Sequence, residues 1–234
     1  MPPPLTPLDL LVVAAAVAMV AQGVVTGIRN AQTPRSELRL VRRYGFTIGR
    51  ALVVSAVILL DWYGAGRSWA LLGFDIPIGI RGLAGFGIDA AIIGFYGYVV
   101  LFREVTPRRM AVARERMDSL KILPETRTEM ALFPVMALLA SPFEELLFRG
   151  FLMWFFLPFA GLWGGAVLSS LLFGTAHAYQ GWRGVARTGL VGFAFAAAYA
   201  LTHSLWWLML AHITLNLGGG LFAMKLKRAA AGAV

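Results

Sequence analysis

Apolar runs of about 20 residues recur along this chain, separated by short polar segments, and no other feature of the sequence constrains its fold as much. A helix needs about 20 apolar residues to cross the hydrocarbon core of a bilayer. We therefore expect seven membrane-spanning segments, at residues 8–28, 46–64, 82–102, 130–153, 159–177, 188–201 and 204–224. Two are weaker candidates, because 188–201 is short and 46–64 contains Arg50.

The composition favours helices surrounded by lipid. Hydrophobic residues make up 59% of the chain and charged residues only 14%, against about 25% charged residues in soluble domains. In lipid, backbone polar groups must be paired within a helix or within a closed barrel. Barrel strands alternate polar and apolar residues, and these runs do not. The expected fold class is all-α, a polytopic transmembrane helix bundle of about seven spans.

Lysine and arginine are concentrated on alternate connections between the runs. They follow the first, third, fifth and seventh runs, at Arg29, Arg35, Arg39, Arg42, Arg43, Arg103, Arg108, Arg109, Arg114, Arg116, Lys121, Arg127, Arg183, Arg187, Lys225, Lys227 and Arg228. Because cytoplasmic loops carry the excess of basic residues, we expect the N-terminus outside and the C-terminus in the cytoplasm, in a bacterial cytoplasmic membrane. The net charge of +9 then indicates contact with an anionic leaflet rather than with nucleic acid.

We expect one integral membrane domain, 1–234, with two unequal parts. Residues 1–128 hold three spans and a basic cytoplasmic loop, and residues 129–234 hold four closely spaced spans. In the loop at 103–128, apolar residues recur at helical spacing among basic ones, which predicts an amphipathic helix that anchors the loop to the leaflet. These residues are Met110, Ala113, Met117 and Leu120.

Three local features of the sequence bear on helix boundaries, cysteine chemistry and the first apolar run. Thr126 and Glu129 form a capping-box pattern, which predicts a helix start there. The chain has no cysteine, so disulfides, thiolate nucleophiles and cysteine metal sites are excluded. No basic residue precedes the first run, which favours a retained helix over a signal peptide.

The fourth run contains ionisable residues, which are costly inside a membrane and need a reason. Glu145 and Arg149 are four residues apart, share a helix face and can pair. Glu144 points about 100° away and is left to act as a general base. A structural role is the alternative, since a Glu–Arg pair can simply hold helices together.

The fifth and seventh runs supply further polar residues. His177 ends the fifth run, and the seventh carries His212 and Asn216. His212 and Asn216 are four apart and share a face, so together they can donate two hydrogen bonds to a developing oxyanion. A lone histidine is more often structural, but these residues and Glu144 all fall in the C-terminal four-helix half. We expect the active site there.

The expected boundaries raise one difficulty. They place Glu144 about 21 Å along its helix from the cytoplasmic start, whereas His177 lies at the cytoplasmic end of its own. The two side chains meet only if Pro142 breaks the fourth helix or the fifth extends past Tyr179, with helix tilt supplying part of the correction.

Three motifs on successive membrane helices resemble the CPBP family, which includes type II CAAX prenyl proteases and bacteriocin-immunity proteins. They are Glu-Glu-x-x-x-Arg at 144–149, Phe-x-x-x-His at 173–177 and His-x-x-x-Asn at 212–216, and they span about a third of the chain. The resemblance implies that Glu144 activates water together with His177. It also implies that His212 and Asn216 form the oxyanion hole, and that Glu145 and Arg149 hold the helix geometry.

The leading functional hypothesis is an intramembrane endopeptidase that hydrolyses a peptide bond of a membrane-associated substrate of the CAAX type, prenylated or not. The alternatives are a non-catalytic membrane scaffold or regulator of the same fold, and a proton-coupled transporter that uses Glu144 and the histidines as a relay. A retinal protein is excluded, because the seventh run has no lysine before Lys225.

Members of this family are often described as metalloproteases, so the sequence raises the question of a metal. The compact His-Glu-x-x-His pattern of many zinc sites is absent, and Asn216 is a poor zinc ligand but a good oxyanion donor. We therefore expect no obligatory cofactor. The alternative is zinc or another divalent metal held by Glu144, His177 and His212.

Overall fold

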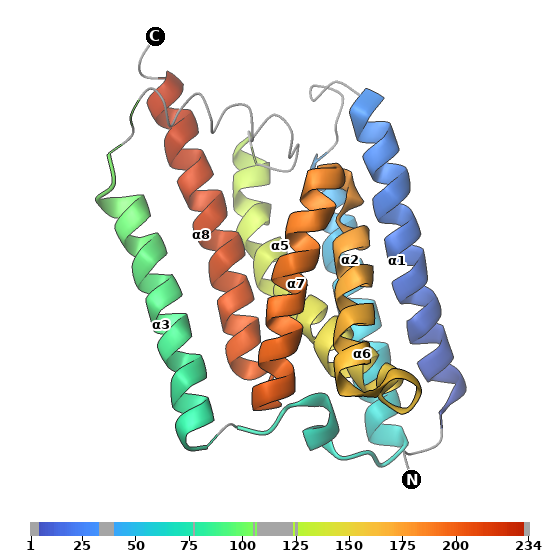
Figure 1. Cartoon of the computed structure of the whole chain (residues 1–234). Coiled ribbons are helices and arrows are strands. Elements are labelled where there is room, and N and C mark those ends of the chain that lie inside the picture. The colour runs from blue at the N-terminus through green and yellow to red at the C-terminus, as the bar shows by residue number, and fades with distance from the viewer. Residues whose placement is uncertain are drawn as a thin grey trace.

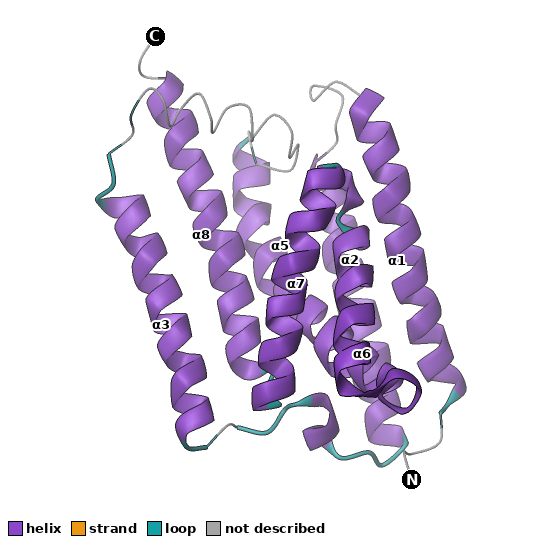
Figure 2. Ribbon diagram, viewed as in Figure 1, coloured by secondary structure: helices purple, strands orange, loops and turns teal. Residues whose placement is uncertain are grey.

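The computed structural model describes residues 5–32, 40–76, 78–104, 106, 124 and 126–231. All regular secondary structure in these ranges is helical, as Figure 2 shows, so the predicted all-α class is confirmed. The long helices are α1 (Pro7–Gln32), α2 (Leu40–Gly64), α3 (Ile80–Leu101), α5 (Arg127–Glu145), α6 (Met153–Ala176), α7 (Trp182–Thr202) and α8 (Trp206–Ala231). Three short elements join them: η2 (Trp69–Leu72), the π-helix η3 (Leu146–Leu152) and η4 (Ala178–Gln180).

Six helical segments of the described chain are long and apolar enough to cross a membrane. One of them, Arg127–Ala176, has 50 residues and would measure about 75 Å as a straight helix, far more than the hydrocarbon thickness of about 30 Å. It folds back at Gly161, whose φ of 67° suits glycine because a Cβ disfavours that conformation. Figure 1 shows α5 and α6 running in opposite directions, so the bundle has about seven passes, as predicted.

The outer surface of the bundle is apolar. Ile80 and Leu83 of α3 are 80% and 71% exposed, and Leu190 of α7 is 73% exposed. Soluble monomers rarely expose apolar side chains so extensively, whereas lipid accommodates them. The structure therefore describes a multi-pass membrane protein.

Close helix packing positions the C-terminal half. A Cβ on Gly174 of α6 would lie 2.9 Å from the Cα of Gly189 on α7, so these two helices touch through small residues, as membrane helices often do. On the other side of α6, Gly23 and Gly27 of α1 lie against the backbone of Ala176 and Ala178, where a Cβ would overlap the carbonyl groups. These contacts hold the chain around the end of α6 from both sides.

Two local predictions can be compared with the structure. The capping box is present, since the Glu129 backbone N–H donates to Thr126 Oγ1 at 3.2 Å and the Thr126 N–H donates to Glu129 Oε2 at 3.1 Å. The amphipathic surface helix predicted around Met110 and Met117 lies outside the described residues.

Candidate active site

A change of helix type begins where the two glutamates lie. Pro142 lies inside α5, and because proline has no N–H the helix loses a hydrogen bond there. The π-helix η3 follows Glu145 directly, and all seven of its residues are buried. Short π segments are frequent at functional sites, because the wider turn changes the direction of the side chains. Glu144 and Glu145 thus lie on the last turn of α5, and Arg149 lies inside the π-helix.

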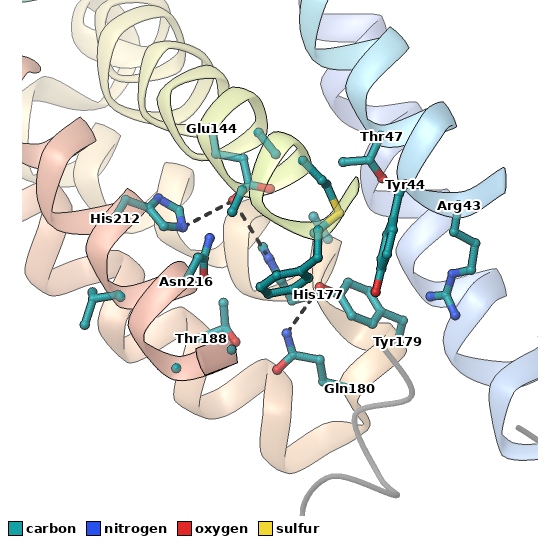
Figure 3. A pocket seen from close by; sticks show the side chains of 18 of the residues that line it. Arg43, Tyr44, Thr47, Glu144, His177, Tyr179, Gln180, Thr188, His212 and Asn216 are labelled. Atoms are coloured by element: carbon teal, nitrogen blue, oxygen red, sulfur yellow. Dashed lines mark hydrogen bonds and ion pairs between the residues drawn. The ribbon is translucent and has the colours of Figure 1, made fainter. Parts of the chain in front are cut away.

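Two histidines from different helices flank the Glu144 carboxylate. Glu144 Oε2 is 3.9 Å from Nε2 of His177, at the end of α6, and 3.7 Å from Nε2 of His212, on α8. Figure 3 shows both rings directed at this carboxylate. The three side chains are 12–14% exposed, so they are shielded but reachable from the cavity that they line.

The second glutamate is fully buried and contacts both Arg149 and His212. Glu145 Oε1 accepts a hydrogen bond from Arg149 Nη1 at 3.0 Å, so the pair predicted from their spacing is present. The same oxygen lies 2.6 Å from Nδ1 of His212. Arg149 also donates from Nη2 to the carbonyl of Gly192 at 3.1 Å, and its guanidinium lies 4.3 Å from the centre of the Phe173 ring. The contact between Glu145 and His212 was not foreseen from the sequence.

The hydrogen bonds determine which histidine nitrogen faces Glu144. His177 Nδ1 lies 2.8 Å from the Phe173 carbonyl. A carbonyl only accepts, so Nδ1 carries the proton and a neutral ring presents its Nε2 lone pair. His212 Nδ1 likewise carries a proton toward the Glu145 carboxylate. Both Nε2 atoms therefore remain for chemistry at Glu144.

Asn216 lies one turn beyond His212 on α8 and lines the same cavity. Its Nδ2 donates to Ser141 Oγ at 3.0 Å. Ser141 is buried on α5, three residues before Glu144, and sequence reasoning did not select it. An amide nitrogen has two donors, so this bond orients Asn216 and leaves the second N–H for another acceptor.

The fold-back at Gly161 explains how Glu144 and His177 meet. Both explanations proposed from the sequence are wrong, because α5 continues through Pro142 and α6 ends at Ala176. The arm of α6 after Gly161 has 15 residues up to Ala176 and is therefore about 22 Å long. That length is less than the hydrocarbon thickness of about 30 Å, so His177 lies within the depth of the bundle.

The cavity around Glu144 has a volume of about 1580 Å³ and receives side chains from α1, α2, α5, α6, α7 and α8. Typical small-molecule pockets hold about 300–1,000 Å³, so this cavity has room for a peptide. Tyr179 of η4 lies in its wall, and burial raises the pKa of the Tyr179 hydroxyl, although a hydrogen bond from Gln180 partly opposes the shift. Tyr179 is therefore a neutral hydrogen-bonding group.

The side chains do not fit a metal site as they stand. Two donors on one zinc ion lie about 3.3 Å apart when each bond is about 2.0–2.1 Å. Glu144 Oε2 lies farther than this from both histidine nitrogens, at 3.7 and 3.9 Å. Among the residues that the structure describes, no group of three His, Cys, Asp or Glu side chains could hold a metal ion. The metal-free hypothesis and its alternative both remain to be tested.

Comparison with known proteins places this site in a family. Residues 126–218 match the family model described as "Type II CAAX prenyl endopeptidase Rce1-like". No curated protein and no solved structure matches the chain. The matched region contains Glu144, Glu145, Arg149, His177, His212 and Asn216. The resemblance predicted from the three motifs is therefore confirmed by the Rce1-like family model, which matches residues 126–218.

Proposed function

We propose that this protein is an intramembrane endopeptidase that uses Glu144 to activate water. The observation that supports this most strongly is the Glu144 carboxylate flanked by the Nε2 atoms of His177 and His212, at 3.9 and 3.7 Å, inside a cavity large enough for a peptide. Both distances are longer than a direct hydrogen bond. The three groups therefore do not bond to one another directly, and their polar atoms stay available to a water molecule in the cavity.

In the proposed mechanism, the attacking water donates one proton to Glu144 and is oriented by the Nε2 lone pair of His177. The water oxygen forms a bond to the carbonyl carbon, and the carbonyl π electrons move to its oxygen. The resulting oxyanion accepts hydrogen bonds from His212 Nε2–H and from the second N–H of Asn216. The C–N bond then breaks, and Glu144 returns its proton to the departing nitrogen.

As this donor, His212 carries a proton on Nε2 as well as on Nδ1. Its Nδ1 lies 2.6 Å from the Glu145 carboxylate, which has no exposed surface. This contact fixes the ring so that Nε2 faces Glu144 and the cavity. Arg149 shares the same oxygen and holds the carboxylate in place. Glu145 and Arg149 thus support catalysis by positioning His212.

The substrate class follows from the location of the site and from the family. Glu144 lies between apolar helices, so the peptide must approach from the membrane or from its edge. The family name adds the expectation of a CAAX-type substrate, prenylated or not, in contact with an anionic leaflet.

The test is cleavage by the purified protein of fluorescent peptides with and without a prenyl group, with the new termini identified by mass spectrometry. Glu144→Gln keeps the shape but removes the base, so it should lower turnover by a factor on the order of 10² to 10⁴ while the protein remains folded in detergent. Glu104→Gln is the matched control, because Glu104 is exposed and does not line the cavity. Unchanged cleavage by Glu144→Gln would show that the base is misassigned. A wild-type protein that cleaves no peptide would favour the non-catalytic scaffold.

A further inference from the structure

Arg43 and Arg50 are two of the three arginines by which α2 lines the active-site cavity, the third being Arg42. Arg43 and Arg50 are seven residues apart, about two helical turns, so they lie on the same face of α2. Within the described ranges, neither forms an ion pair with a carboxylate. Arg43 Nη1 and Arg50 Nε are buried and have no hydrogen-bond partner among those residues. Both side chains are half-buried in the cavity wall, so they offer two guanidinium groups to an anionic group of a bound molecule.

Each arginine is held by uncharged groups. Arg50 Nη1 donates to Gln22 Oε1 of α1 at 2.9 Å, and the Arg43 guanidinium lies 5.9 Å from the centre of the Tyr179 ring. These contacts orient the two side chains, and the Glu144 carboxylate interacts with Arg50 only across a distance longer than an ion pair. Both residues precede the region that matches the family, which begins at residue 126. The family match therefore assigns them no role.

Tyr179 connects this pair to Glu144 through short steps. Its ring centre is 5.6 Å from that of His177, whose Nε2 is 3.9 Å from Glu144 Oε2. The Tyr179 hydroxyl accepts a hydrogen bond from Gln180 Nε2 at 3.3 Å, so its own proton can be donated to a ligand. Figure 3 shows Tyr179 between Arg43 on one side and His177 and Glu144 on the other.

The chemistry of the pair matches a carboxylate. Guanidinium groups bind carboxylates through two parallel hydrogen bonds, and a neutral tyrosine adds a third donor. An extended peptide advances about 3.3–3.6 Å per residue, so a chain end bound here would place a peptide bond at Glu144 only a few residues upstream. We propose that Arg43, Arg50 and the Tyr179 hydroxyl bind the free C-terminal carboxylate of the peptide substrate. This inference rests on the proposed function and assigns the contact with the chain end to residues of α2, outside the region that matches the family.

The experiment compares two peptides that differ only at the chain end, one with a free carboxylate and one with a carboxamide. Wild-type protein should prefer the carboxylate in kcat/KM by a factor on the order of 10 to 100. Arg43→Gln and Arg50→Gln should each reduce this preference, and the double variant should bring it to within about twofold of unity, because cleavage of the carboxylate peptide falls much more than cleavage of the carboxamide. The lysine variants retain the charge and should keep part of the preference.

Arg183→Gln is the matched control. Arg183 is exposed near the start of α7 and does not line the cavity, so this variant should keep the full preference. Equal cleavage of both peptides by the wild type would overturn the proposal. A glutamine variant that slows both peptides by the same factor would also overturn it, because that result indicates a structural role.

A binding measurement distinguishes failure of this proposal from failure of the proposed function. If the wild type cleaves neither peptide, the proposed function fails, and the affinities of the labelled peptides for the wild type and the glutamine variants still decide the subsite. A preference for the carboxylate that depends on Arg43 and Arg50 supports the proposal, and equal affinities overturn it. The measurement is repeated in phosphatidylcholine with and without phosphatidylglycerol. Arginine-dependent binding of the anionic lipid without discrimination between the peptides would identify a headgroup phosphate instead and overturn the proposal.

Discussion

Arg149→Ala should strongly destabilise this protein, because it leaves a carboxylate buried without its main partner. Arg149 is 1% exposed, and its Nη1 lies 3.0 Å from Oε1 of Glu145, which has no exposed surface. Breaking a buried ion pair by removing one partner costs about 3–5 kcal/mol. The same substitution deprives the Gly192 carbonyl of its donor and removes the guanidinium from the Phe173 ring.

Other contacts of Arg149 and Glu145 add to this loss of stability or offset it. A buried carbonyl left without its donor costs about 1–3 kcal/mol, and a desolvated cation–π contact is worth about 2 kcal/mol. In the other direction, His212 Nδ1 remains 2.6 Å from Glu145, and its hydrogen bond offsets part of the loss. We expect a net loss of about 3–5 kcal/mol in the free energy of unfolding. The measurement is equilibrium unfolding in mixed detergent micelles, followed by circular dichroism.

Two further variants test whether the unpaired Glu145 carboxylate causes the loss of stability. Arg183→Ala removes an exposed arginine and should change the free energy of unfolding by less than about 0.5 kcal/mol. Glu145→Gln combined with Arg149→Met leaves no buried charge, so it should recover at least half of the loss. A single variant within about 1 kcal/mol of the parent would show that Arg149 is not what stabilises Glu145. A double variant that is no more stable than Arg149→Ala would also show that the unpaired charge of Glu145 is not the cause of the loss.

Two other predictions concern orientation and the metal. Tags at the C-terminus and in the loop at 103–128 should report the cytoplasm, and tags at the N-terminus or near Gly73 should report the opposite side; a C-terminus on the outer side would mean that the orientation is wrong. Cleavage should survive dialysis against a strong chelator, with metal content measured on the same sample. Activity that disappears with the metal and returns with one equivalent of a divalent ion would instead make Glu144, His177 and His212 the ligands.

The helices could be predicted because a helix that crosses lipid needs about 20 consecutive, mostly apolar residues. The apolar runs located all the long helices, and the capping box at Thr126 identified the start of α5. The ends of α2 and α7 were less well predicted. α2 begins at Leu40 rather than at residue 46, because its polar first turns are held by tertiary contacts such as Tyr44 against Phe133. A window of hydropathy does not register such contacts.

The geometry of the site was predictable only in part. The Glu145–Arg149 pair follows from helical periodicity alone, whereas the Glu145–His212 contact joins residues 67 positions apart and depends on how α5 and α8 pack. The fold-back at Gly161 was also missed. The chain has 26 glycines, and the sequence alone does not show which of them adopts a positive φ and which lies within an ordinary helix. That single residue shortens the arm of α6 and brings His177 to Glu144.

The need to satisfy polar groups in an apolar bundle also orients the site. Water is scarce between membrane helices, so polar side chains there must find protein partners. His177 Nδ1 is taken by the Phe173 carbonyl, His212 Nδ1 by Glu145, and one Asn216 N–H by Ser141. Each of these bonds fixes the side of the group that faces the helices, which leaves both histidine Nε2 atoms and the second Asn216 N–H for the cavity around Glu144. The hydrogen bonds that satisfy these polar groups between the helices are thus the same ones that direct the remaining donors and lone pairs into the cavity.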